Sequence, residues 1–381
     1  MPAIIPLSLY IHFPWCTSKC PYCDFNSYAK TAEPIPESDY IAALKQDLFN
    51  DLDKVQGRKL TSIFMGGGTP SLFSSTSIEN LLDFIQQHIP FEKNIEITLE
   101  ANPESLDYKK LVGYRAAGVN RISIGVQSFN GEQLKKLGRA HGHAQACAAI
   151  SATQKAGFSN YNIDLMYGLP KQTVSEALND LEEAMSFSPP HLSWYHLTLE
   201  PNTVFYTKPP KHLPSDNRLI EIEQTGREFL VDKNLERYEI SAYARLGRMA
   251  RHNYNYWEFG DYLGIGAGAH GKITDLTSGT VLRLWKLRTP KTYLNKEKNY
   301  MGGQKILTPE DLKLEFLMNS LRLTKGLNKQ LFTERTGLEY AEIEPAIAAL
   351  QEENLIHKSD ERLQLTEQGL LFLDEILARF V

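Results

Sequence analysis

Cysteine is scarce in this chain, which has four among 381 residues, and no apolar run is long enough to cross a bilayer. A framework of disulfides is therefore not expected. The opening segment MPAIIPLSLY lacks a basic region before an apolar stretch, which argues against export. The formal net charge of -5 gives no general attraction to phosphate backbones, so nucleic acid is not expected as a partner. These features indicate a cytoplasmic protein.

Three of the four cysteines form one compact motif. Cys16, Cys20 and Cys23 follow a C-x3-C-x2-C spacing, and Cys147 is the other cysteine. A [4Fe-4S] cluster prefers soft thiolate ligands, and three of them leave one iron open to a small molecule. The alternative is a structural zinc site that adds His12, although zinc sites more often use two separated ligand pairs. Aromatic residues around the loop would shelter a cluster from water: Phe13, Trp15, Tyr22 and Phe25.

Short apolar segments alternate with helical segments over the first two hundred residues. The apolar segments are SLYIHF, LTSIFMGGG, IEITLEANP, RISIGVQS, YNIDLMYGLP and LSWYHLTLEP. Their spacing of roughly thirty residues is that of a βα unit, and their composition suits strands covered on both faces. Residues 77–88 and 107–117 have the apolar periodicity of covering helices, with Gly113 and Gly118 as turn signals. The sequence predicts an α/β fold built on a partial (β/α)6 barrel of the TIM type.

The pattern changes in the second half of the chain. A proline-rich link precedes a predicted helix over 214–234, and a Tyr- and Gly-rich stretch follows to about residue 289. We expect this stretch to form extra sheet that closes the barrel. Residues 308–381 favour short amphipathic helices, including one over 370–380, and a small hairpin at LIHKSDERLQLTE.

These patterns divide the chain into two predicted domains. Residues 1–300 would form the barrel with its sheet extension, and residues 301–381 a small winged-helix-like domain. The hydrophobic fraction of 42% is sufficient for a large core. The second domain lacks a strongly basic recognition helix, so it is expected to act as a lid or docking module rather than to bind DNA. A redox sensor that uses this domain on DNA is a third functional hypothesis, which a mobility-shift assay would test.

Glycines and polar residues stand at the ends of the predicted strands. They are Gly66 to Thr69, Glu100, Gln127 and Asp164. The carboxyl ends of parallel strands meet at one rim of a barrel, so these residues are expected to converge beside the cysteine loop, which follows the first strand. Glycine allows the backbone to approach a ligand closely.

The motifs resemble the radical S-adenosylmethionine (SAM) superfamily, in which SAM binds the open iron and one-electron reduction yields a 5'-deoxyadenosyl radical. Over nearly the whole chain the sequence is similar to the family of anaerobic coproporphyrinogen III oxidase. The resemblance implies SAM contacts from these residues: Tyr10, Gly67, Gly68, Thr69, Glu100, Gln127, Arg139 and Asp164. Glu100 and Arg139 would engage polar ends of SAM, Asp164 the ribose hydroxyls, and Tyr10 would pack near the adenine. The GGGTP turn lacks the acidic member of the family's GGE-like motif.

Two departures from the oxidase pattern point to a heme-chaperone branch of the same family. Phe25 occupies the last position of the oxidase's C-x3-C-x2-C-x-C loop, so a thiol used near the oxidase active site is missing. The segment RHNYNYW contains an HNxxYW motif, which the resemblance associates with heme binding. His252 would then ligate heme iron, and Tyr256 and Trp257 would pack on the porphyrin. His270 is the rival ligand.

The resemblance implies a heme chaperone that carries a [4Fe-4S] cluster and SAM and passes heme to acceptor hemoproteins. A reductant such as flavodoxin or ferredoxin, and peripheral membrane association through the acceptors, belong to this hypothesis. The alternative is an oxygen-independent coproporphyrinogen III oxidase, which removes hydrogen from propionate side chains with loss of carbon dioxide. No residue is assigned a catalytic role. His141, His143 and Cys147 are expected to be structural.

Overall fold

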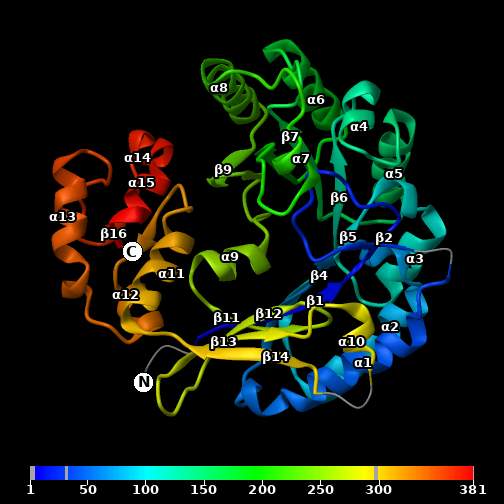
Figure 1. Cartoon of the computed structure of the whole chain (residues 1–381), viewed down its shortest axis with the longest axis horizontal. Helices are drawn as coiled ribbons and strands as arrows, with labels where there is room; N and C mark the ends of the chain where they lie inside the picture. The colour runs from blue at the N-terminus through cyan, green and yellow to red at the C-terminus, as the bar shows by residue number, and fades with distance from the viewer. Residues whose placement is uncertain (1–4, 31–32, 296–298, 381) are drawn as a thin grey trace.

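Six parallel strands form the centre of the fold, and each pairs with the next (Figure 1). The computed structural model describes residues 5–30, 33–295 and 299–380, so the first four residues of the opening segment lie outside the described part. The strands are β1 (Leu7–Phe13), β4 (Leu60–Gly67), β5 (Phe91–Ala101), β6 (Arg121–Gln127), β7 (Tyr161–Tyr167) and β8 (His191–His196). The helices between them are α1 (Glu37–Asn50), α2 (Ser75–His88), α3 (Tyr108–Ala116), α4 (Gly131–Lys136), α5 (His143–Lys155) and α6 (Val174–Ser186). The predicted partial (β/α)6 barrel is confirmed.

The sheet continues beyond the six strands at both edges. β11 (Asp261–Ile265) pairs parallel with β1, and antiparallel strands follow it: β12 (His270–Thr274), β13 (Val281–Lys286) and β14 (Met301–Ile306). At the other edge, β10 (Ala242–Ala244) and β9 (Glu236–Glu239) continue antiparallel from β8. The expectation that extra sheet closes the barrel is wrong, because the described residues form an open twelve-stranded sheet with β14 and β9 as its edges. Residues of the C-terminal domain contact β9 on one side and β13 on the other, so the two ends of the described sheet do not pair with each other.

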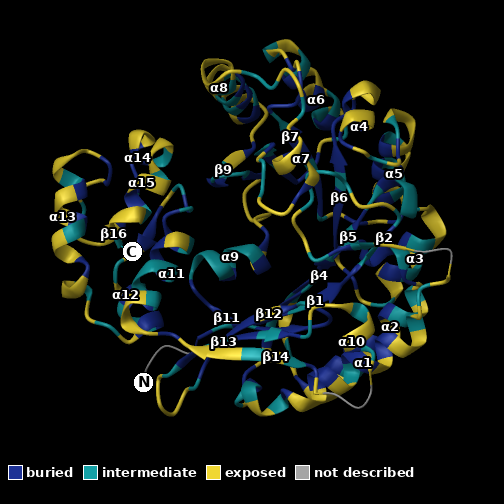
Figure 2. Ribbon diagram, in the orientation of Figure 1, coloured by how far each residue is buried: buried dark blue, intermediate teal, exposed yellow. Residues whose placement is uncertain are grey.

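Side-chain alternation along β1 explains where the core lies. Leu7, Leu9 and Ile11 are fully buried and point toward the outer helices, whereas Ser8 and Tyr10 point into the barrel, where Ser8 Oγ bonds Ser62 Oγ at 2.7 Å. The apolar core therefore lies between sheet and helices, and the barrel interior is polar. Figure 2 shows the buried strands at the centre, with exposure concentrated on the outer faces of the helices. No helix within the described residues combines the length and apolar character that a bilayer crossing requires.

The two glycines predicted as turn signals have different roles. Gly118, with a φ of 101°, follows α3 and ends it in a left-handed conformation. Gly113 lies inside α3, so that prediction is wrong. A Cβ on Gly113 would overlap the side chain of Ser75 at the start of α2, and the glycine therefore permits close packing of the two helices.

The described residues between β8 and the C-terminal domain form four helices. They are α7 (Val204–Thr207), α8 (Asp216–Asp232), α9 (Arg251–Trp257) and α10 (Pro290–Tyr293). The helix predicted over 214–234 is confirmed as α8. α9, which holds the HNxxYW motif, lies against the inner side of the barrel, because the His252 ring bonds Ser62 of β4 and its backbone N-H donates to Glu96 Oε1 of β5.

The C-terminal domain has an apolar core around Phe316, Leu317 and Phe332, to which Phe259 and Val281 of the preceding sheet region also belong. Its elements are α11 (Pro309–Ser320), β15 (Leu327–Asn328), α12 (Gln330–Thr336), α13 (Glu344–Glu352), β16 (Arg362–Leu363), α14 (Glu367–Leu371) and α15 (Leu373–Leu377). The predicted hairpin is present, with Ile356 bridged to Leu365, and β16 also pairs with β15. The single helix predicted over 370–380 is instead divided between α14, α15 and a short 3-10 turn.

This domain packs beside β9 at one edge of the open sheet and against β13, the strand next to the other edge (Figure 1). Beside β9, Thr324 donates its backbone N-H to the Tyr238 carbonyl at 3.2 Å and its hydroxyl to the Arg237 carbonyl at 2.8 Å. Beside β13, Arg283 Nη2 lies 2.6 Å from Glu315 Oε2 of α11. The Thr324 bonds satisfy backbone carbonyls of the edge strand β9 that have no neighbouring strand on that side within the described residues. The C-terminal domain therefore occupies the opening that the strands leave.

Candidate cluster and cofactor site

The parallel strands end around a cavity of about 1210 Å³. Its lining runs from the cysteine loop over the ends of β4 to β8 and reaches α8, β9, β10 and α14. Nine residues selected from the sequence line it: Cys16, Cys20, Cys23, Gly67, Gly68, Glu100, Gln127, Arg139 and Asp164. Five others do not: Tyr10, Thr69, His252, Tyr256 and Trp257. Most of the residues selected from the sequence thus lie at one rim, as expected for residues at the ends of parallel strands.

Short backbone pairings hold the cysteine loop at this rim. β2 (Trp15–Cys16) pairs with β3 (Tyr28–Ala29), which joins the start of the loop to its end. Within the loop, the Cys23 N-H donates to the Cys20 carbonyl at 3.1 Å. Asn26 Nδ2 then donates to the Ala267 carbonyl at 2.9 Å and so ties the loop to the segment after β11. Cys16 is buried, and Cys20 and Cys23 are half-buried. The three thiols are therefore fixed in place and sheltered.

The sulfur positions do not suit a single zinc ion. Two thiolates on tetrahedral zinc lie about 3.8 Å apart. Within the described residues, the three sulfurs are not among the groups of three ligand atoms that lie within 4.8 Å of one another. His12, the fourth ligand of the zinc alternative, is engaged through both nitrogens, by Tyr10 Oη and the Asn26 carbonyl, each at 2.9 Å. Three separate thiolates fit a cluster in which each binds a different iron.

The glycine turn after β4 allows two chain segments to touch. The Gly68 N-H donates to the Phe13 carbonyl at 2.7 Å. A Cβ on Gly68 would lie 2.6 Å from the Trp15 carbonyl oxygen, and one on Gly67, whose φ is 105°, would overlap the His12 ring. The Gly67 N-H donates to Glu100 Oε2 at 3.2 Å. The glycines are thus required by the packing of the rim, and Gly67 also orients a cavity-lining carboxyl group.

Two carboxyl groups in the cavity are costly to ionise. Burial, together with the nearby Asp164, raises the pKa of Glu100 to about 8. Burial also raises the pKa of Asp164, although its carboxyl accepts hydrogen bonds from Asn162 Nδ2 at 2.7 Å and Ser123 Oγ at 3.1 Å. A positively charged ligand between them would favour both carboxylates. The chemistry of this part of the cavity therefore suits a cation.

Arg139 and Gln127 complete the polar wall beside the cysteine loop. Arg139 Nη2 donates to Asn102 Oδ1 at 2.7 Å and to the Gly125 carbonyl at 2.6 Å, and its Nη1 lies 3.8 Å from Cys20 Sγ. Gln127 ends β6 with a φ of 72°, a conformation that costs free energy for a residue with a side chain. Its Oε1 accepts from Tyr195 Oη at 2.7 Å. Such strain is typical of functional loops.

The HNxxYW motif lies beneath the cavity. His252 is 1% exposed, with Nδ1 2.9 Å from Ser62 Oγ and Nε2 2.7 Å from Tyr256 Oη. Burial lowers the pKa of its ring to about 3, so His252 is neutral at pH 7. Trp257 packs toward the C-terminal domain, where its ring lies 4.5 Å from the Arg322 guanidinium. Asn253 is the motif residue that lines the cavity. Reaching a cavity ligand would require His252 to exchange one of its hydrogen bonds.

His196 was missed in the sequence, although it ends β8 on the same rim. Its imidazole lines the cavity and stacks on Tyr167 with ring centroids 5.5 Å apart. Within the described residues no hydrogen-bond partner engages its ring nitrogens, and burial lowers its pKa. The strand-end argument that selected Asp164 applies equally to LSWYHLTLEP and could have found it. His270, the rival proposed from the sequence, is exposed at the start of β12 and does not line the cavity.

Comparisons with known proteins agree with this architecture. The model of the radical SAM superfamily matches residues 10–184, and that of the HemN C-terminal domain matches residues 307–372. The structure of coproporphyrinogen III oxidase (HemN) from Escherichia coli, described as a radical SAM enzyme, superposes with a TM-score of 0.82. It is 25% identical and the match covers 99% of this chain and 90% of that one. Fold and site thus define a radical SAM protein with a HemN-type C-terminal domain.

Sequence relatives identify the particular family. The heme chaperone HemW of Haemophilus influenzae is 49% identical, and the match covers 100% of this chain and 99% of that protein. The heme chaperone HemW of Escherichia coli is 46% identical over 99% of this chain and 98% of that one. The chain therefore belongs to the HemW family.

Proposed function

We propose that this protein is a heme chaperone that carries a [4Fe-4S] cluster and SAM, binds heme in the same cavity and passes it to acceptor hemoproteins. The observation that carries the proposal is one cavity that joins the cysteine loop to an exposed apolar mouth. The relatives named heme chaperone HemW support it. A bound cluster with one open iron supplies one-electron reduction of SAM. Flavodoxin or ferredoxin is the expected reductant.

Residues of the cavity would divide the work of holding these groups. Cys16, Cys20 and Cys23 would bind the cluster, because thiolates are its preferred ligands. Five residues would contact SAM directly: Gly67, Glu100, Gln127, Arg139 and Asp164. Asp164 suits the ribose, since one carboxylate accepts from two vicinal hydroxyls. Tyr10 and Thr69 would act as positioning residues, because they bond His12 and Asn102 rather than line the cavity.

The mouth of the cavity offers apolar surface to a porphyrin. Phe25, Ile220 and Leu371 line it and are nevertheless 58%, 54% and 69% exposed. A flat apolar ligand that covers these exposed apolar groups removes them from water, and this lowers the free energy of the complex. His196 lines the same cavity with unengaged ring nitrogens and is our first choice for an axial ligand. His252, suggested by the motif, is the second.

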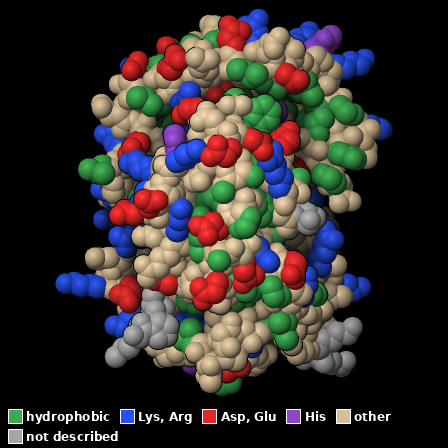
Figure 3. Space-filling view, turned by 90° about the vertical axis from the view of Figure 1, so that its left-hand side faces the viewer, with side chains coloured by type: hydrophobic (Ala, Val, Ile, Leu, Met, Phe, Trp, Pro, Cys, Tyr) green, Lys and Arg blue, Asp and Glu red, His purple; other side chains and the backbone are tan. Residues whose placement is uncertain are grey.

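The C-terminal domain is proposed as a lid at this mouth, with the division near residue 300 predicted from the sequence. The apolar core around Phe316, Leu317 and Phe332 is distinct from the barrel core and supports the division, although Phe259 and Val281 from before that point also pack into it. Arg227 of α8 pairs with Glu367 of α14 at 2.5 Å, and both line the cavity. Figure 3 shows acidic and basic side chains interspersed on the face that includes this domain. A mixed surface of this kind gives no support to the DNA-binding alternative.

Anaerobic heme titration tests the proposed function. Cluster-loaded protein with SAM should take up heme stoichiometrically, and mixing with reductant and coproporphyrinogen should yield no vinyl product, because Phe25 replaces the oxidase's additional thiol. Visible spectra follow heme, and chromatography follows the porphyrins. Robust vinyl formation would favour the oxidase alternative and overturn the chaperone assignment.

The same heme titration with histidine variants identifies the axial ligand of the heme iron. His196→Ala should change the spectrum of bound heme, whereas His270→Ala and the exposed control His357→Ala should not. His252→Ala should lower stability by roughly 1–3 kcal/mol, since it leaves buried partners unpaired, yet keep the heme spectrum. A changed spectrum in His252→Ala together with an unchanged one in His196→Ala would assign ligation to the motif histidine instead.

Binding of SAM should release a proton at pH 7. Glu100 holds a proton there because its pKa is raised to about 8, and cationic SAM favours the carboxylate. The affinity for SAM should therefore rise as the pH rises toward 8. Calorimetry in buffers of different ionisation enthalpy should count about one proton per SAM. Glu100→Gln should abolish the release and the surface control Glu132→Gln should keep it; equal release from both variants would contradict the assignment.

A further inference from the structure

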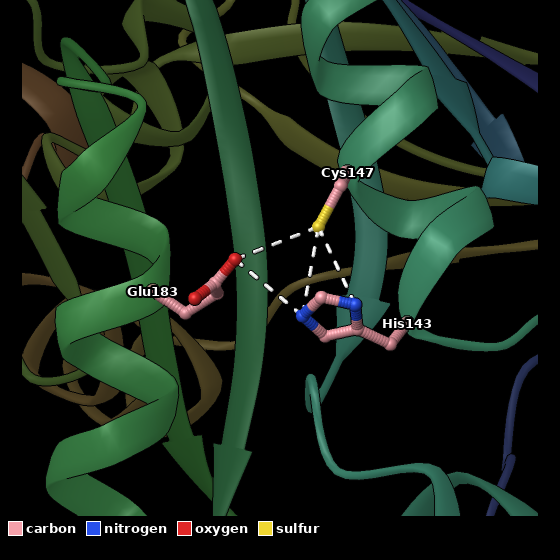
Figure 4. Close-up of side chains that lie close together, drawn as sticks. All are labelled: His143, Cys147 and Glu183. Carbon is pink, nitrogen blue, oxygen red and sulfur yellow. Dashed lines mark hydrogen bonds and ion pairs between the residues drawn. The ribbon is translucent and has the colours of Figure 1, made fainter.

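Three potential metal ligands meet on the outer surface of the barrel, away from the cavity. His143 and Cys147 lie one turn apart on α5, and Glu183 reaches them from α6 (Figure 4). Cys147 Sγ is 3.7 Å from His143 Nε2 and 3.6 Å from Glu183 Oε1. His143 Nε2 is 3.4 Å from the same Glu183 oxygen. One imidazole nitrogen, one sulfur and one carboxylate oxygen thus form a compact triangle.

The triangle has the dimensions of one face of a zinc coordination tetrahedron. With ordinary bond lengths, tetrahedral zinc places a thiolate sulfur about 3.6 Å from a neighbouring nitrogen or oxygen ligand, and nitrogen about 3.4 Å from oxygen. All three separations match the observed ones closely. The cluster cysteines do not form such a group within the described residues. Cys147 with its two neighbours therefore fits a single zinc ion, whereas the three loop cysteines fit a cluster.

The donor types select the same class of ion. Thiolate, imidazole and carboxylate together suit zinc, whereas magnesium and calcium prefer oxygen ligands alone. In the metal-free protein the Cys147 thiol donates to Glu183, and zinc binding would release that proton to solvent. The ring of His143 packs edge-on against Phe129 at 6.0 Å, which restricts its orientation. His143 and Glu183 keep 54% and 39% of their side chains exposed, so the ion can enter and a fourth position stays open.

We propose that His143, Cys147 and Glu183 form a surface site for Zn²⁺, separate from the cluster, with its fourth position open to water or to a ligand from a partner. Three protein ligands and one open position are typical of exchangeable or reactive zinc rather than of closed structural sites. The sequence prediction that His143 and Cys147 are structural would then be replaced by a binding role. His141 differs, because its Nε2 bonds the buried Val126 carbonyl at 3.0 Å.

Zinc binding to the cluster-loaded chain tests the proposal. The protein is equilibrated anaerobically with Zn²⁺ buffered by a chelator, and zinc and iron are measured per chain. One zinc is expected in addition to the cluster iron, and zinc X-ray absorption should show one sulfur with nitrogen and oxygen neighbours. Cys147→Ser, His143→Gln and Glu183→Gln should each weaken zinc binding by roughly 100-fold, since even outer-shell losses cost roughly 10- to 100-fold.

The exposed His357→Gln variant is the matched control and should bind zinc as the wild type does. Iron content and circular dichroism of each variant verify that cluster and fold are intact, so loss of zinc cannot reflect unfolding. The proposal is overturned if wild type binds no more zinc than Cys147→Ser, or if the absorption spectrum lacks sulfur. Zinc retained by all three variants would assign the ion to other residues and equally overturn it.

Discussion

Replacing Cys16, Cys20 or Cys23 with alanine should eliminate the brown chromophore and reduce iron from about four atoms per chain to background. Each thiolate would hold a different iron, and two remaining ligands cannot retain a cube that already has one open corner. The effect should be all-or-none for each of the three positions. Anaerobic reconstitution followed by iron and sulfide analysis and Mössbauer spectroscopy measures it.

Cys147→Ala is the matched control, because Cys147 lies on the outer helix α5 and does not line the cavity. It should retain full iron and the chromophore. The loop variants should keep the circular dichroism of the metal-free wild type, since Cys20 and Cys23 are not part of the apolar core. Equal iron in all four variants would refute the assignment of the cluster to this loop.

Asp261→Ala should lower the free energy of unfolding by about 3–5 kcal/mol, the range found when one partner of a buried ion pair is removed. The Asp261 side chain is fully buried and lies 2.7 Å from Arg58 Nη1 and 2.8 Å from Lys272 Nζ. It also accepts the Thr274 N-H at 2.7 Å. Removing the carboxylate leaves two buried cations without a counter-charge. Denaturant unfolding of the metal-free protein measures the loss.

The pH dependence of the free energy of unfolding, measured for wild type and Asp261→Ala, supplies a second test. Burial by itself raises the pKa of Asp261, but Lys272 and the hydrogen bonds from Arg58 and Thr274 outweigh it, and the net pKa is lowered. A carboxyl group with a lowered folded pKa stabilises the protein above its unfolded pKa, and this contribution is lost as the pH falls below about 4. Wild type and Asp261→Ala should therefore converge in acid. The exposed control Glu132→Ala should show neither effect; a loss below 1 kcal/mol for Asp261→Ala would contradict the expectation.

The sequence was most informative where residues lie at strand ends. Glu100 and Asp164 are 64 positions apart in the sequence but face the same cavity, because the ends of parallel strands converge whatever lies between them. His196 also lies at the end of a parallel strand and lines the cavity, so the same argument could have selected it. Side-chain periodicity likewise predicted the buried strand β1 and the helix α8. Strand-end position and side-chain periodicity are both read from short stretches of sequence, and each concerns the placement of side chains on one strand or helix.

The sequence was least informative where packing between distant elements decides the outcome. The HNxxYW segment gave no sign that α9 turns inward, where Ser62 and Tyr256 bond both nitrogens of His252. Gly113 indicated a turn and instead permits a close helix contact. No local pattern shows what a side chain will meet from another part of the chain.

By itself the sequence determined the repeating βα architecture, the three-cysteine loop and the rim at which polar strand ends gather, because periodicity, spacing and strand direction are properties of the chain alone. Tertiary structure alone decided that the sheet stays open, that the C-terminal domain fills the gap, that His196 rather than His252 reaches the cavity, and that His143, Cys147 and Glu183 meet. Each of these depends on contacts between segments far apart in sequence, and their geometry is set only when the whole chain packs.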